Sequence, residues 1–379
     1  MLINFDNAAT TFPKPESVRA AARNAAEKLG GNSGRGGHAL AMKSSAAVYS
    51  ARESIAEMFG AQPENTVFTL NCTHALNMAI QGVMHGGGHL IISSMEHNSV
   101  ARPAAALAAE KRISLSVAEV YPDDSRTVES FRKLMRPDTK AVVCTLASNV
   151  TGQLLPWKAI AEVCREHGVC FIADGAQACG VTDVSLSDGI NILCTAGHKG
   201  LYGLSGTGLL ISDGSFSIYP VIQGGTGTAS KDLRQPLLLP EALESGTLNI
   251  PGIMSLKAGC EFVRRTGTDA IFRHESAVCS RFIREISDIP GIRVLRSEGA
   301  SYVPIVSFTA EGIPPEELAA ELSDAGYCLR AGFHCAALAH SSLGTENGTV
   351  RFSPSVFSRT QDAVSLAAVI KLIVKNKNK

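Results

Sequence analysis

A short segment near the C-terminus, RAGFHCAALAH (residues 330–340), gathers four side chains that can do chemistry. Arg330, His334, Cys335 and His340 stand within one Gly- and Ala-rich stretch. A cysteine in such a setting is a small buried hydrophobe, a metal ligand, or a nucleophile whose thiolate a nearby cation favours. The segment by itself leaves these three interpretations open.

Two further reactive residues, Asp174 and Lys199, follow apolar runs in the middle of the chain. Asp174 ends VCFIAD, and Lys199 follows His198 in GHKGLYG, just after NILCTA. A buried ammonium needs a partner or loses its proton, and Schiff-base chemistry uses such a lysine. Pyridoxal phosphate requires a lysine and a carboxylate that keeps its ring nitrogen protonated. The pair therefore predicts a pyridoxal-phosphate site, although Asp174 alone could equally cap the next helix.

The phosphate of such a cofactor needs a cradle, and TLNCTHALNMAI (69–80) offers one. Cys72, Thr73 and His74 open a helical pattern after a strand-like run. Free amides and the dipole at a helix N-terminus attract a dianion, and the Thr73 hydroxyl adds a donor, although Thr73 could be a plain N-cap. His97 lies in the loop after HLIISS, where an imidazole could stack on the pyridine ring or serve only as a loop residue.

Apolar runs that alternate with helical patterns must position these residues. Helices are predicted over residues 74–84 and 157–168. Alternating units of this kind indicate a mostly parallel sheet with helices on both faces, and functional loops at the carboxyl ends of its strands. The predicted strands cover residues 65–70, 89–94, 114–120, 139–147, 168–174, 189–196 and 207–212.

A segment rich in Gly, Thr and Pro, residues 224–253, interrupts this rhythm and predicts a long loop of the kind kept for function. After about residue 270, shorter strand and helix patterns suit a smaller α+β unit. We therefore expect a large α/β domain over residues 16–252 and a small domain made of residues 1–15 and 253–379.

Composition narrows the class of protein. Lys plus Arg and Asp plus Glu both number 35, so no basic excess favours nucleic acid or a membrane surface. The ten cysteines never form a Cys-x-x-Cys pair, which predicts buried reduced thiols and no metal site. The chain shows no signal-peptide pattern and no membrane-length apolar run, and we therefore expect a cytoplasmic protein.

The whole set of motifs resembles a known family. The chain is similar to the class V aminotransferase superfamily of fold-type I pyridoxal-phosphate enzymes, and within it to the cysteine desulfurases, nearest to the group II type that includes selenocysteine lyases. The resemblance extends over nearly the full length, in family order. The segments that carry it are FDNAATTFPKP, GRGGHALA, CTHALNMAI, EHNSV, SNVTGQLLP, ADGAQ, GHKGLYG, ESGTLNIPGI, RAGFHCAALAH and VRFSPSVFSRTQDAV.

The resemblance implies a role for each cofactor contact. Lys199 would hold pyridoxal phosphate, Asp174 would pair with its ring nitrogen, and Gln177 would hydrogen-bond its phenolic oxygen. His97 would stack on the ring and assist proton transfer. Thr73 and His198 would bind the phosphate, and the remaining contacts would be Cys72, Thr195 and Asn149.

The resemblance also implies a substrate site and a homodimer. Arg351 and Asn149 would hold the α-carboxylate of L-cysteine or L-selenocysteine, since an arginine fork suits a carboxylate. Thr247, in ESGTLN, would touch the cofactor phosphate of the partner subunit. The other residues expected near the substrate are Asn7, Ala8 and Arg330.

The implied reaction makes Cys335 a nucleophile. The Cys335 thiolate would take the substrate sulfur as a persulfide, alanine would leave, and the sulfur would pass to an unknown acceptor protein. Arg330 and His334 are close in sequence and favour a reactive thiolate. The other nine cysteines mostly lie in apolar runs.

Three features depart from the group II pattern. Ala196 stands where relatives carry Ser or Thr three residues before the lysine, with Thr195 one step earlier. Gly34 stands where a histidine is expected beside an arginine, and the chain is somewhat short.

Other activities stay open at this point: a selenocysteine lyase, a transaminase or β-eliminating lyase with the same cofactor, an idle scaffold, or a thiol-based metal-binding protein. A transaminase has no use for Cys335. Retention of Lys199, Asp174, His97 and Arg351 argues against a scaffold, and the isolated cysteines argue against a metal.

Overall fold

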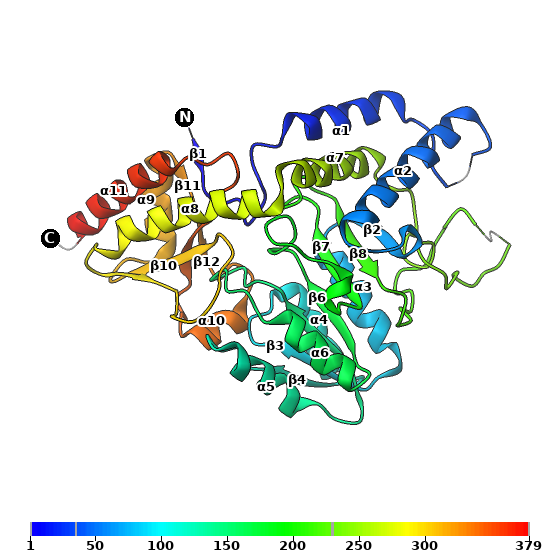
Figure 1. The fold of residues 1–379 in the computed structure, drawn as a ribbon, viewed down its shortest axis with the longest axis horizontal. Helices are drawn as coiled ribbons and strands as arrows, with labels where there is room; N and C mark the ends of the chain where they lie inside the picture. Colours follow the sequence, from blue (N-terminus) through cyan, green and yellow to red (C-terminus); the bar gives the residue numbers. More distant parts are fainter. Residues whose placement is uncertain (1, 35, 229–230, 378–379) are drawn as a thin grey trace.

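The computed structural model describes residues 2–34, 36–228 and 231–377. A seven-stranded sheet forms its centre (Figure 1). Each strand lies inside one of the seven ranges predicted from the apolar runs, so the predicted sheet is confirmed. In sheet order the strands are β2 (Thr66–Thr69), β8 (Gly208–Ser212), β7 (Ile192–Ala196), β6 (Cys170–Asp174), β5 (Thr139–Thr145), β3 (His89–Ser93) and β4 (Ser114–Ala118).

The sheet is mostly parallel. β3 pairs in parallel with β4 and β5, β5 with β6, and β6 with β7. Only β8, among the described strands of this sheet, runs against both of its neighbours, β7 and β2. The carboxyl ends of β3, β5, β6 and β7 therefore lie at one edge, where open α/β sheets place their ligand sites.

Helices cover both faces of the sheet because the side chains of its strands alternate between two apolar cores. Val142 and Phe171 belong to one buried cluster, while the next residues, Val143 and Ile172, belong to the other. The first cluster is completed by α2 (Ala39–Met58), α5 (Asp124–Leu134), α6 (Trp157–Glu166) and α7 (Ile250–Thr266). The second is completed by α3 (Cys72–Val83) and α4 (Asn98–Ala109).

A smaller antiparallel sheet follows in the chain. Its order is β12 (Arg330–Gly332), β13 (Thr349–Phe352), β10 (Val306–Ala310) and β9 (Ile292–Val294). It has its own core, in which the rings of Phe282 and Phe352 stack at 4.1 Å. The helices of this part are α8 (Thr268–Ser287), α9 (Pro315–Asp324), the short α10 (Ala337–Leu343) and α11 (Thr360–Lys377).

The N-terminus joins this smaller part. β1 (Ile3–Asn4) pairs in parallel with β11 (Tyr327–Cys328), as expected if residues 1–15 belong to the small domain. The predicted boundary between residues 252 and 253 falls inside α7, whose buried side chains lie in the core of the large sheet and against which α1 (Glu16–Lys28) packs (Figure 1). The domain division itself stays a prediction.

The remaining elements are brief. Three 3-10 turns cover Pro63–Asn65, Met84–Gly86 and Leu186–Asp188. The described residues between β8 and α7 form no helix or strand, which confirms the predicted long loop up to residue 249. Its last four predicted residues, 250–253, are instead the first turn of α7. Eight of the ten free cysteines are buried, Cys328 is partly buried and Cys335 is exposed. Among the described residues, no helix is long and apolar enough to cross a membrane.

A buried carboxyl group links the two parts. Glu275 of α8 is 4% exposed and accepts a hydrogen bond from the Tyr202 hydroxyl at 3.3 Å. The backbone N–H of Val356 donates to the same tyrosine oxygen at 3.2 Å. Desolvation raises the pKa of Glu275 to about 8, so the carboxyl group is largely neutral at pH 7. The contact fastens the chain just after Lys199 to α8.

Glu275→Gln is expected to stabilise the protein increasingly as the pH rises. In the wild type the carboxyl group has a pKa of 4.5 in the unfolded chain and of about 8 in the folded protein. The wild type therefore has its full folding stability below about pH 4.5 and loses part of it as the pH rises toward 8. Thermal unfolding should show a gain of roughly 4 kcal/mol for the variant at about pH 8 and less than about 1 kcal/mol at about pH 5. Exposed Glu261→Gln is the control, and the same pH trend in both variants would contradict the assignment.

Candidate active site

A cavity of about 210 Å³ opens at the carboxyl edge of the large sheet. It is lined by residues from β5, β6, β7, α3 and α4 and from the β12–β13 region of the smaller sheet. Twelve of the residues predicted from the sequence line it: Ala8, Cys72, Thr73, His97, Asn149, Asp174, Gln177, His198, Lys199, Arg330, Cys335 and Arg351. The structure thus brings together side chains that lie hundreds of residues apart in the chain.

Strand pairing accounts for the floor of the cavity. Thr145 and Asp174 end β5 and β6 and are paired in register. Ala196 ends the next strand, β7, and Lys199 follows it by one turn. The carboxylate and the amine therefore reach the cavity from the ends of adjacent strands.

Asp174 has one free oxygen toward the cavity. It is 3% exposed, and its Oδ1 accepts hydrogen bonds from the Ala176 N–H at 2.9 Å and from the Cys72 thiol at 3.5 Å. Its Oδ2 has no hydrogen-bond partner among the described residues. A buried carboxylate with an unpaired oxygen suits a protonated ring nitrogen.

The amine of Lys199 is prepared for covalent chemistry. Its Nζ makes no hydrogen bond or ion pair with another described residue. Desolvation is the main cause that lowers the pKa of Lys199, and the nearby Asp174 carboxylate opposes the shift. A lysine with a lowered pKa is more often neutral, which is the form that attacks an aldehyde.

The end of the cavity nearest α3 has the donors that a phosphate group needs. Asn71 caps α3, because its side chain accepts from the His74 N–H at 2.8 Å, so Thr73 is not the N-cap. The exposed Thr73 hydroxyl and the amides of Cys72 and Thr73 are left for a ligand, whereas the His74 amide is used by the cap. His198 lines the same cavity. Burial lowers its pKa to about 4, and its buried Nδ1 has no partner in the described part of the chain.

His97 is neutral and oriented by its neighbour. The Ser99 N–H donates to its Nδ1 at 3.0 Å, which leaves the ring proton on Nε2. Desolvation, with smaller effects from Lys199 and two arginines, lowers the pKa of His97 to about 4. The residue is the N-cap of α4 and also lines the cavity. The alternative that His97 serves only as a loop residue does not account for these two positions.

Arg351 supplies a buried positive charge. It is 1% exposed, donates to the Asn149 carbonyl oxygen at 2.9 Å and pairs with Asp6 at 3.0 Å. Desolvation lowers its pKa, and Asp6 opposes that shift. Its Nε is buried without a partner among the described residues, so the guanidinium group keeps a donor for an anionic ligand.

Cys335 is the exposed thiol of the cavity. Its Sγ lies 3.6 Å from Nη2 of Arg330, which donates to it. Its backbone has φ of 57°, in the left-handed region that non-glycine residues rarely adopt. Cys72 also lines the cavity, but burial and the neighbouring Asp174 raise the pKa of that thiol well above its usual range. Cys335 is therefore the better nucleophile of the two.

Cys335 also borders a second opening. A groove of about 560 Å³ along α4 is lined by Cys335, His97, Asn98 and Arg102, among others. The thiol thus stands where the inner cavity meets the protein surface. A group that binds to the sulfur from the inner cavity is therefore accessible from the groove along α4.

Three predicted residues do not line the cavity. Thr195 is 1% exposed and its hydroxyl donates to the Gly175 carbonyl at 3.3 Å, while the next residue, Ala196, faces the cavity. Thr195 therefore does not replace the hydroxyl that relatives carry at position 196. The Asn7 side chain is buried and donates to the Ser353 carbonyl at 3.0 Å. Gly34, which marks a departure from the group II pattern and is not one of these three, lines a different cavity.

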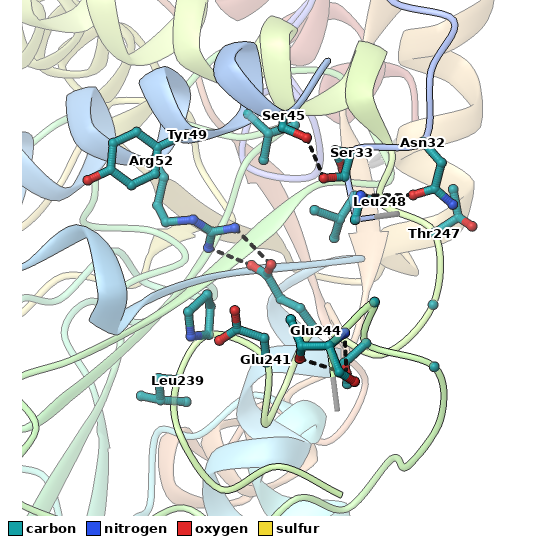
Figure 2. Close-up of a pocket in the computed structure, with 18 of the residues that line it drawn as sticks. Asn32, Ser33, Ser45, Tyr49, Arg52, Leu239, Glu241, Glu244, Thr247 and Leu248 are labelled. Carbon is teal, nitrogen blue, oxygen red and sulfur yellow. Dashed lines mark hydrogen bonds and ion pairs between the residues drawn. The ribbon is translucent and has the colours of Figure 1, made fainter. Parts of the chain in front are cut away.

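Thr247 is the third, and it lines a different cavity of about 630 Å³ (Figure 2). Among its lining residues, Arg52 and Glu244 point toward each other in Figure 2. Two hydrogen bonds of 2.7 and 2.8 Å join their guanidinium and carboxylate groups. Glu244 also accepts from the Phe68 N–H at 2.7 Å, which fastens the loop that carries Thr247 to β2. Within one chain Thr247 does not reach Lys199, and its role toward a partner subunit stays a prediction.

The sequence reasoning missed several groups. Asp6, the ion-pair partner of Arg351, was part of a quoted motif but was given no role. Asn71, which caps α3, was visible as a helix-start signal, since Asn is a preferred N-cap. Glu96, in the loop after β3, is fully buried, and its carboxyl oxygen accepts from the Thr145 N–H at the end of β5 at 2.7 Å, a contact that no local pattern indicates.

The fold and the lysine–carboxylate cavity define an α/β enzyme of fold-type I. The chain belongs to the class-V aminotransferase family, whose model matches residues 3–366. The resemblance inferred from the motifs is thereby confirmed.

Among similar proteins, a probable cysteine desulfurase from Methanothermobacter thermautotrophicus is 29% identical over 97% of this chain and 94% of its own length. A cysteine desulfurase from Synechococcus elongatus is 31% identical over 98% of this chain, which spans 60% of that protein. The apo structure of a cysteine desulfurase from Thermococcus onnurineus superimposes with a TM-score of 0.91 at 27% identity, covering 99% of this chain and 95% of the other.

Proposed function

We propose that the protein is a pyridoxal-phosphate-dependent cysteine desulfurase that converts L-cysteine to L-alanine and receives the sulfur on Cys335. The observation that carries the proposal is the position of this exposed thiol, beside Arg330, at the mouth of the cavity that holds Lys199 and Asp174. The names of the similar proteins support it.

The residues present fit the cofactor. Lys199 would hold it covalently, the free Oδ2 of Asp174 would receive its ring N–H, and the unpartnered His198 Nδ1, Thr73 and the α3 amides would bind its phosphate. Gln177 lies at the side of the cavity and donates to Ala8 at 3.1 Å. Bound pyridoxal phosphate supplies an aldehyde for imine exchange and a ring that withdraws electrons from the substrate α-carbon.

The protein side chains would then perform three tasks. Arg351 holds the substrate carboxylate through its fork, with Asp6 and Asn149 fixing its plane. Lys199, once exchanged by the substrate amine, moves the proton at the α-carbon. His97, neutral with its proton on Nε2, donates toward the cofactor-facing side of the cavity.

Sulfur transfer would follow at Cys335. Its thiolate attacks the substrate sulfur, so an S–S bond forms while the bond from Cβ to sulfur breaks. The electron pair of the broken bond stays on the carbon skeleton, where protonation gives alanine. The persulfide faces the groove along α4, from which an acceptor thiol would remove the outer sulfur.

The test incubates the purified protein with L-cysteine and, separately, with L-selenocysteine, in the presence of excess dithiothreitol, which reduces the persulfide and releases its outer sulfur. It measures alanine together with sulfide or selenide. Alanine and sulfide in equal amounts from cysteine are expected. Turnover of selenocysteine alone would favour a selenocysteine lyase. Exchange of an amino acid with a 2-oxo acid, without sulfide, would favour a transaminase and contradict the proposal.

We also propose a homodimer in which Thr247 serves the partner's site. The loop before α7 exposes a group of large apolar side chains, which is unusual for a free surface. These side chains are Leu233, Leu237 and Leu238. On α2, the side chains of Leu40 and Tyr49 are also at least half exposed.

Mixing Thr247→Ala with Lys199→Ala is expected to restore activity if Thr247 acts across the interface. Half of the randomly mixed dimers contain both chains, and one of their two sites has both native residues, so roughly a quarter of wild-type activity should appear. Cofactor absorbance and cysteine turnover measure it. Activity no greater than the average of the separate variants would show that Thr247 does not act in the partner's site.

A further inference from the structure

Behind Cys335 lies a buried cluster of two histidines and two threonines that the proposed chemistry does not use. His334 Nε2 and Thr349 Oγ1 are 2.8 Å apart, and His340 Nδ1 and Thr345 Oγ1 are also 2.8 Å apart. All four side chains are at most 6% exposed. The two imidazole rings lie next to each other, with centroids 5.7 Å apart.

The turn that carries the nucleophile has an unfavourable backbone conformation. His334 and Cys335 are consecutive non-glycine residues with φ of 49° and 57°. Left-handed conformations of this kind persist only where surrounding contacts hold them. The turn therefore needs tethers.

The structure provides tethers from both parts of the fold. From the large-sheet side, the Asn149 amide donates to the His334 carbonyl at 2.7 Å and the Asn98 N–H donates to the Cys335 carbonyl at 2.7 Å. From the smaller sheet, Thr349 of β13 holds the His334 ring. Arg351 lies two residues further along the same strand, so the nucleophile and the carboxylate site share one support.

We propose that Thr349 is a positioning residue that, through its hydrogen bond to His334, holds the strained turn and keeps the Cys335 sulfur facing the cavity and Arg330. The catalytic consequence rests on the function proposed above. The effect on the backbone of the turn is independent of that function.

The contact does not depend on a change of charge. Burial, aided by Arg351, lowers the pKa of His334 to about 2, so the ring is neutral throughout the physiological range. The titratable and charged groups that face it are Arg351 of β13, Arg330 of β12 and His340 of α10. A neutral ring bonded to a hydroxyl is a fixed anchor and not a pH switch.

Thr349→Val tests the proposal, because valine keeps the β-branched shape of the strand residue and removes the hydroxyl. Hydrogen exchange read by mass spectrometry follows the amides of Ala336, bonded to Phe333, and Asn98, bonded to Cys335. We expect exchange there to accelerate, and kcat for cysteine to fall, by roughly five- to tenfold, the factor expected for one lost buried hydrogen bond. KM and the cofactor spectrum should not change.

Matched variants separate positioning from general packing. Thr349→Ser, which restores the hydroxyl, should recover both readouts. Thr345→Val makes the same change in the same cluster but touches His340, and it should leave exchange in the turn and kcat as in the wild type. Thr349→Ala replaces Thr349→Val if the latter does not fold.

The outcomes are decisive and separable. Unchanged exchange in Thr349→Val, or equal effects of Thr345→Val, would overturn the positioning role whatever reaction the enzyme performs. If the wild type does not convert cysteine, the proposed function fails, while the exchange measurement still decides whether Thr349 holds the turn.

Discussion

Cys335→Ala is expected to lose cysteine turnover by about a thousandfold or more, because the variant has no group to accept the substrate sulfur. The cofactor absorbance should stay intact, since Cys335 lies at the mouth of the cavity while Lys199 and Asp174 rise from its floor. Alanine formation and the visible spectrum of the purified protein check both parts.

The structure explains why no other thiol should substitute. Cys72, the second thiol of the cavity, hydrogen-bonds to Asp174, and burial raises its pKa well above the usual range. Cys328→Ala is the matched control, because this partly buried cysteine lies on β11 and does not line the cavity. If Cys335→Ala desulfurated cysteine as fast as the wild type, the nucleophile assignment would be wrong.

Lys199→Ala is expected to purify without covalently attached cofactor and without measurable turnover. Lys199 is the sole lysine that lines the cavity among the described residues, and desolvation lowers its pKa and so favours the neutral amine. Its loss removes both the covalent link and the group that moves the proton at the substrate α-carbon. Borohydride reduction followed by mass measurement of the intact chain detects the link.

Lys257→Ala serves as the control for a general effect of removing a lysine. Lys257 lies on α7, where its Nζ donates to Ser50 at 2.9 Å, and it should keep both the link and the activity. A normal absorbance and a reducible link in Lys199→Ala would overturn the cofactor assignment. Lys14, which donates to the His198 carbonyl at 2.8 Å, would then be the amine to examine.

The parts of the fold that were predictable depend on local patterns. Each strand of the large sheet is a short apolar run bounded by turn residues, and burial on both faces makes such runs conspicuous. Asp174 and Lys199 follow two of these runs directly, so their meeting at one edge follows from parallel pairing. The predicted end of the large domain at residue 252 lies inside α7, which continues beyond that residue and packs into the same core.

The sequence did not indicate features that depend on strand register or on contacts between distant parts of the chain. Side chains alternate along β7, so Thr195 and Ala196 point to opposite faces, and only Ala196 reaches the cavity. Asp6 and Arg351 form an ion pair across 345 positions of the chain. No short-range pattern encodes a contact of that separation.

The sequence by itself determined the family, the sheet, and the lysine and carboxylate at its carboxyl edge. Each of these depends on patterns of residues that are close together in the chain. Only the tertiary structure decided what Cys335 is. It is not a buried hydrophobe but an exposed thiol on a strained turn beside Arg330. Hydrogen bonds from Asn149, Asn98 and Thr349, which come from both parts of the fold, create that setting. Reactivity depends on such surroundings more than on residue type.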